Sequence, residues 1–101
     1  MSASLDHMGA FAEQLRREVY PLRDLHPALA DDVHRLFIAM WEAIEDPILV
    51  VRIRRRIRNV VAREFRYMAE NYETMPGPKQ SDHLGQAWHY RQQARRFDAR
   101  P

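Results

Sequence analysis

PILVVRIRRRIRNVVAREFRYMAENY, residues 47–72, is the longest continuous helical pattern in the chain. Its apolar residues recur three or four positions apart, the spacing of side chains that share one side of an α-helix. They form two adjacent rows: Val50, Ile53, Ile57 and Val60, then Val61, Phe65, Met68 and Tyr72. Two rows indicate packing against two neighbours, as in a helical bundle. At about 1.5 Å per residue, we expect a helix of roughly 39 Å.

Prolines mark the boundaries of the other predicted helices. Pro21 follows a helical pattern, and a proline lacks a backbone donor and crowds the preceding turn. Pro27 and Pro47 suit the first turn of a helix, and Asp46 is placed to cap the helix that follows it. Pro-Gly-Pro predicts a loop. We expect helices at about 4–20, 27–45, 47–72 and 82–97, with a loop at 74–81.

These elements predict an all-α fold, a single-domain antiparallel four-helix bundle with a long central third helix. The length of 101 residues is that of one domain. Hydrophobic residues make up 46% of the chain and charged residues 30%, as in ordinary globular proteins. One helical domain over residues 1–101 is therefore expected.

The composition also bears on the cellular compartment. The chain has no cysteine, which excludes disulfides, thiolate metal sites and cysteine nucleophiles. The first residues, MSASLDHMGAFAEQL, are acidic where a signal peptide would be basic. The longest apolar runs, LFIAMW and ILVV, are too short to span a bilayer. We expect a cytoplasmic protein with no membrane span.

Charge is divided unevenly along the chain. Residues 1–50 carry four arginines and nine acidic residues, a net charge of −5. Residues 51–101 carry eleven arginines, one lysine and five acidic residues, a net charge of +7. Such an asymmetry indicates that the charged halves contact oppositely charged partners. The basic half could meet an external polyanion, or it could meet the acidic half of this chain or of another copy.

Five arginines of the third helix are predicted to face away from its apolar rows. On a helical wheel at about 100° per residue, they lie within about 60° of one line. Guanidinium groups match phosphate oxygens, so this side could hold a nucleic-acid backbone. It could equally meet an acidic protein surface, or only solvent. The five residues are Arg52, Arg55, Arg56, Arg63 and Arg66.

Four further residues predict a contact with another helix or subunit. Arg54 and Arg58 lie off the five-arginine side, flanking the second apolar row. Ile38 and Trp41 lie outside the main apolar stripe of the second helix, whose apolar side is wider than one neighbour covers. We expect Ile38 and Trp41 to lie in a partner contact or beneath the N-terminal helix.

Glu64 breaks the apolar pattern of the third helix. An unpaired carboxylate on an apolar side is costly, so it needs a partner or a shifted pKa. A catalytic or ligand-binding acid is one interpretation. We favour a structural bond across the bundle, to Arg91, His34 or the Trp88 indole. The prediction is a buried polar pair of Glu64 with Arg91.

Sequence motifs for chemistry are absent from the chain. It has no Glu-x-x-His pair, no His-Glu-x-x-His, no glycine-rich phosphate loop and no Gly-x-Ser-x-Gly, so no metal or cofactor is expected. We expect a non-catalytic interaction or assembly subunit that self-associates or docks on a larger protein. The alternative is a nucleic-acid backbone-binding protein that uses the arginine-rich side of the third helix.

Overall fold

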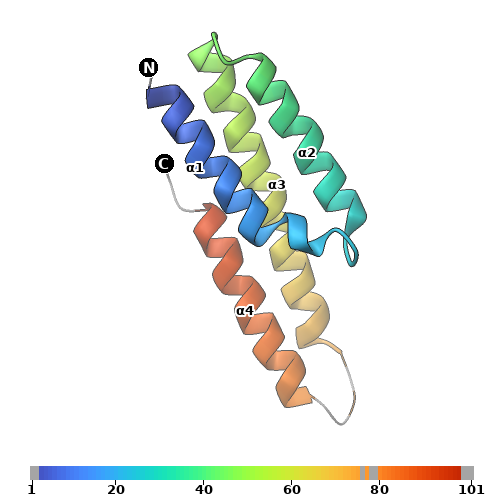
Figure 1. Ribbon diagram of the computed structural model, residues 1–101. Coiled ribbons are helices and arrows are strands. Elements are labelled where there is room, and N and C mark those ends of the chain that lie inside the picture. The colour runs from blue at the N-terminus through green and yellow to red at the C-terminus, as the bar shows by residue number, and fades with distance from the viewer. Residues whose placement is uncertain (1–2, 76, 78–79, 99–101) are drawn as a thin grey trace. The chain divides into compact units, whose positions relative to one another are not determined.

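The computed structural model describes residues 3–75, 77 and 80–98 and is all-helical over them (Figure 1). The elements are α1 (Ala3–Glu18), a short 3-10 helix η1 (Tyr20–Leu22), α2 (Pro27–Glu42), α3 (Pro47–Glu73) and α4 (Gln80–Asp98). The prediction of an all-α protein is confirmed. Over the same residues, no helix combines the length and apolar character needed to cross a membrane.

The start of α3 follows the predicted capping chemistry. The Asp46 side chain accepts a hydrogen bond from the backbone N–H of Leu49 at 3.2 Å. This bond satisfies one of the backbone donors that have no partner within a helix's first turn. Pro47 occupies the first helical position, where its missing N–H costs nothing. Together these two residues fix where the longest helix begins.

The helix ends differ from the predicted ends by a few residues. α1 ends at Glu18, because the chain tightens into η1 around Pro21. α2 ends at Glu42, three residues before the predicted end. The backbone N–H of Asp46 donates to the carbonyl of Ala43 at 2.8 Å, which closes a tight turn into α3. The capping residue thus also shortens the helix before it.

The contacts within the chain divide it into two compact units, Met1–Ile57 (unit 1) and Arg58–Pro101 (unit 2). Unit 1 holds α1, α2 and the first part of α3 (Figure 1). The ring of Tyr20 meets that of His34 edge-on at 6.2 Å. The apolar core of this unit consists of Met8, Phe11, Leu15, Val19, Leu29, Ala30, Val33, Met40, Val50 and Ile57.

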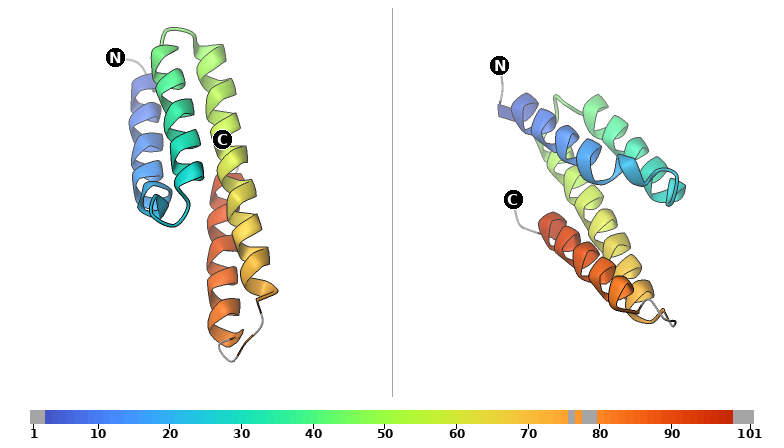
Figure 2. Two further views of the ribbon diagram at one scale, coloured as in Figure 1. Left: turned by 90° about the vertical axis from the view of Figure 1, so that its right-hand side faces the viewer. Right: turned by 60° about the horizontal axis from the view of Figure 1, so that its bottom comes forward.

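Unit 2 is a helical hairpin in which α4 lies beside the second part of α3 (Figure 2). The ring of Tyr72 lies 6.1 Å from that of His83 and 5.7 Å from that of Tyr90. Seven positions earlier in α3, the ring of Phe65 lies 5.9 Å from that of Tyr90 and 6.0 Å from that of Phe97. Earlier residues of α3 thus meet later residues of α4, so α4 returns along α3.

Small residues let the rings of unit 2 approach each other. Ala87, Ala94 and Phe97 of α4 are at most 2% exposed, and Tyr90 is 8% exposed. These four residues follow one another three or four positions apart, so they share one side of α4. On α3, Ala62 and Ala69 are fully buried beside Phe65. Unit 2 is therefore held by alternating alanines and aromatic rings.

Candidate interaction surfaces

The predicted arginine side of α3 is exposed. We call Arg52, Arg55, Arg56, Arg63 and Arg66 the arginine ridge, and all five are exposed. The first three belong to unit 1 and the last two to unit 2. The ridge thus presents charged groups to solvent, and its binding of phosphate or of an acidic surface stays a prediction.

One member of the ridge has an acidic partner within unit 2. The Arg66 guanidinium forms an ion pair with the Asp98 carboxylate at the end of α4. Both side chains are nearly half exposed, at 46% and 47%. Exposed pairs contribute little to stability, because water and salt screen them. Among the ion pairs found in the described part of the chain, Arg66 is the member of the ridge that takes part in one.

Arg54 and Arg58 are half-buried, in contrast to the ridge. Arg58 Nη1 donates a long hydrogen bond of 3.5 Å to the backbone carbonyl of Phe97. That carbonyl lies in the last turn of α4, where helix carbonyls lack intrahelical partners and a cation is favourable. Arg58 thus meets another helix within its own unit. Whether Arg54 meets a subunit stays a prediction.

The predicted buried pair of Glu64 with Arg91 is wrong. Both residues are only half-buried, and Arg91 pairs with Glu73 instead. Glu64 precedes the fully buried Phe65, so it points about 100° around the helix from the side that packs on α4. Arg91 follows Tyr90, which stacks on Tyr72, so the hairpin brings Arg91 opposite Glu73.

The Glu73–Arg91 ion pair is bidentate. Arg91 Nε donates to Glu73 Oε2 at 2.7 Å, and Arg91 Nη2 donates to Oε1 at 2.5 Å. The hydrogen bonds from Arg91 lower the pKa of the Glu73 carboxyl, against a smaller opposing effect of desolvation. The same bonds raise the pKa of Arg91. Sequence reasoning missed this pair because periodicity along one helix does not give the register between two.

Ile38 and Trp41 are exposed, at 43% and 51%. The alternative that they lie beneath the N-terminal helix is therefore wrong. Ile38 lies on the side of α2 opposite the buried Met40, and Trp41 lies about 100° around the helix from it. A contact with a partner is the alternative that stays a prediction for both residues.

Other large apolar side chains are exposed where the sequence predicted none. At the start of α3, Ile48 is 69% exposed and Val51 is 40% exposed. In α4, Trp88 is 64% exposed. The signal was available for Ile48, since it lies two positions before Val50, which places it on the opposite side of the helix.

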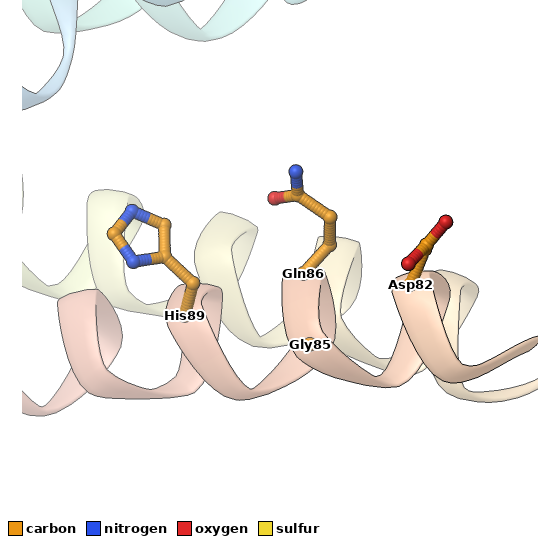
Figure 3. Close-up of a pocket in the computed structure, with 4 residues that line it drawn as sticks. All are labelled: Asp82, Gly85, Gln86 and His89. Carbon is orange, nitrogen blue, oxygen red and sulfur yellow. The ribbon is translucent and has the colours of Figure 1, made fainter.

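A shallow hollow lies along α4, lined by Asp82, Gly85, Gln86 and His89 (Figure 3). Asp82, Gln86 and His89 project from the same side of the helix, as their spacing of four and three residues requires. Gly85 has no side chain to fill the space between them. In the described part of the chain, no three His, Asp or Glu side chains come close enough to hold a metal ion.

Elsewhere, the shifted pKa values have structural causes. The pKa of Glu13 is lowered by its hydrogen bonds to Arg16, one helical turn away. The pKa values of Tyr20 and Tyr90 are raised by burial. These groups lie in a surface ion pair or in the packing of aromatic rings.

The exposed charges and apolar side chains of α2, α3 and α4 are thus the features of this chain with which a partner could interact. No family model, no curated protein and no solved structure matches the chain.

Proposed function

We propose that this protein is a non-catalytic helical interaction or assembly subunit that self-associates. The observation that carries the proposal is the exposure of both tryptophans, Trp41 at 51% and Trp88 at 64%. Tryptophan is a large apolar side chain that is highly buried on average. It is also enriched among the residues that dominate binding energy at protein interfaces.

The division of charge supports self-association over docking on an unrelated protein. An acidic first half and a basic second half give each copy complementary surfaces to offer another. Docking on a larger protein is the alternative within this proposal. We also propose that the protein is cytoplasmic and that its four helices form one antiparallel domain.

The test uses the two tryptophans as reporters. Size exclusion with light scattering, over a range of concentrations, gives the mass of the particle. Self-association predicts a mass above 12.1 kDa and a blue shift of tryptophan emission that grows with concentration. Trp41→Phe and Trp88→Phe, studied separately, assign the shift to one helix. A chain that remains a monomer with unshifted emission at high concentration would contradict the proposal.

A second candidate is binding to a nucleic-acid backbone through the arginine ridge. The observation in its favour is that the arginines of the ridge in unit 1, Arg52, Arg55 and Arg56, are exposed on α3. Within the described residues, the ion pairs found do not involve these three. Exposed guanidinium groups outside these ion pairs are suited to phosphate oxygens.

Salt dependence tests the second candidate. Binding to a short single-stranded RNA would weaken steeply with salt and vary little with base sequence. Replacing the three arginines with glutamine would reduce the slope of log affinity against log salt by about 2. The matched control replaces Arg17, Arg23 and Arg35 with glutamine and would leave the slope unchanged. A folded protein that does not bind RNA at low salt would eliminate this candidate.

A further inference from the structure

Two helices of unit 1 expose side chains of the same spacing and of opposite charge. The α2 stripe is defined as Ile38, Trp41, Glu42 and Glu45, the last of which lies in the turn after the helix. The α3 stripe is defined as Ile48, Val51, Arg52 and Arg55. In each stripe the later members follow the first by three, four and seven positions. Each therefore reads as two apolar residues followed by two charged ones.

Both stripes are accessible. The four charged side chains are exposed. Among the apolar members, Ile48 is 69% exposed, and the other three are between 40% and 51% exposed. Residues at this spacing share one side of a helix, which places Ile38, Trp41 and Glu42 together on α2, with Glu45 following in the turn after the helix. It also places all four members of the α3 stripe together on α3. The opposite sides carry Met40 and Val50, at most 6% exposed, so the stripes are the faces of α2 and α3 that the core of unit 1 leaves uncovered.

The charged side chains of the stripes are outside the ion pairs found in the described part of unit 1. In the described part of unit 1, ion pairs join Glu13 to Arg16 and Asp32 to Arg35. Neither pair includes a member of a stripe. The carboxylates of one stripe and the guanidinium groups of the other thus face solvent beside large apolar side chains. Such a surface needs a partner that offers both apolar area and opposite charge.

We propose that the α2 stripe of one copy of this chain docks on the α3 stripe of a second copy. This rests on the self-association proposed above and names its interface. Because the spacings match, the apolar pair of one stripe meets the apolar pair of the other while carboxylates meet guanidinium groups. The fork of an arginine fits a carboxylate well. Each copy carries both stripes, so the contact forms twice in a symmetric pair.

A second copy fits both stripes, whereas other occupants fit only one. An anionic lipid surface or a nucleic acid would attract the α3 stripe through Arg52 and Arg55. Neither would attract the α2 stripe, whose Glu42 and Glu45 repel phosphate, and Trp41 would stay exposed. The charge complementarity between the two stripes therefore points to the chain itself.

Charge reversal followed by mixing tests the proposal. One variant carries Glu42→Arg and Glu45→Arg, and the other carries Arg52→Glu and Arg55→Glu. Each variant alone would place like charges opposite one another and weaken association by at least about tenfold. In an equimolar mixture the reversed stripes complement each other. Sedimentation velocity at one salt concentration would then show affinity restored to within about threefold of the original chain.

Matched controls separate the interface from net charge. The Asp24→Arg/Glu70→Arg and Arg17→Glu/Arg23→Glu variants change the net charge by the same amounts, at exposed positions outside both stripes. Both would associate like the original chain. Helical content by circular dichroism, measured on all four variants, verifies that the fold persists.

Each other outcome overturns the proposal in a distinguishable way. Variants that associate as tightly as the original chain would place the interface elsewhere and leave self-association standing. If each variant associates weakly alone and the mixture does not recover the affinity, the two stripes do not face each other. An original chain that stays monomeric would remove both this interface and the proposed function. If that monomer binds anionic vesicles or RNA and Arg52→Glu/Arg55→Glu abolishes the binding, the α3 stripe has a different occupant.

Discussion

Arg91 of α4 holds both carboxylate oxygens of Glu73, the last residue of α3. The residues just before them, Tyr72 and Tyr90, stack with their ring centroids 5.7 Å apart. A polar and an aromatic contact therefore fix the same register near the end of α3 that leads into the hairpin's connection. The pair is partly exposed, so its contribution depends on solution conditions.

Acid should remove the contribution of the Glu73–Arg91 ion pair to the stability of the folded protein. The pKa of Glu73 in the folded protein lies below its ordinary value of 4.5. A lowered pKa stabilises the fold above the ordinary value, and this contribution is lost as pH falls through the lowered pKa. We expect Glu73→Gln to be less stable than the original chain at pH 7 and the difference to vanish in acid. Urea unfolding between pH 7 and pH 2 measures it.

The control for this pH dependence is Glu70→Gln. Glu70 is exposed and influences Arg91 only through the longer-range field of its charge. Its replacement should change stability less at pH 7. A difference between Glu73→Gln and the original chain that stays constant with pH would contradict the ion-pair explanation.

The Asp46 cap should be worth a measurable part of the stability of unit 1. Asp46→Ala leaves the backbone N–H of Leu49 without its side-chain acceptor, and the loss of a cap costs about 0.5–2 kcal/mol. Asp46→Asn keeps an acceptor oxygen and should cost less. Thermal and urea unfolding compare both with Asp24→Ala, a change at another exposed turn position. Equal losses for Asp46→Ala and Asp24→Ala would show that the cap contributes nothing.

Two aromatic residues of α4 should respond very differently to truncation. Phe97 is 1% exposed and packs on Phe65, so Phe97→Ala should cost about 3–5 kcal/mol through lost burial and a cavity. Trp88 is 64% exposed, so Trp88→Ala should change the stability of the monomer by less than about 0.5 kcal/mol. Urea unfolding at a concentration where the protein is monomeric measures both. Similar losses would mean that Trp88 is covered in solution.

Two glycines offer substitutions of opposite sign. Gly77 has a φ of +131°, a conformation that alanine adopts only with strain, so Gly77→Ala should cost about 1–3 kcal/mol. Gly85 lies inside α4, and a methyl group there meets nothing within 4 Å. Gly85→Ala should therefore stabilise the helix by up to about 1 kcal/mol. Losses of stability from both substitutions would contradict the assignment of strain to Gly77 alone.

The helices could be predicted from the sequence because their signals are local. Asp46 and Pro47 determine the start of α3 through their own side chains and backbone, without reference to the rest of the fold. Apolar spacing likewise identified Val61, Phe65 and Met68 as one buried row. The end of α2 was less predictable, because the turn that closes at Asp46 competes with continued helix at Ala43.

Contacts between helices could not be predicted in the same way. Glu73 and Arg91 are 18 positions apart, and their pairing depends on how α4 slides along α3. Glu64 looked buried on a wheel because the wheel does not say where the neighbouring helix lies. Exposure was predictable for the arginine ridge, since charged residues opposite an apolar row face solvent. What the ridge, the stripes and the tryptophans bind is not contained in periodicity.

The aromatic contacts of unit 2 restrict how this chain can change its length. Tyr90 and Phe97 are separated by seven positions, and both meet Phe65. One residue inserted between them would turn Phe97 by about 100° and carry it off that ring. A residue inserted between α3 and α4 leaves the spacing within each helix intact. Variation in length is therefore tolerated at the hairpin's connection and excluded from its helices.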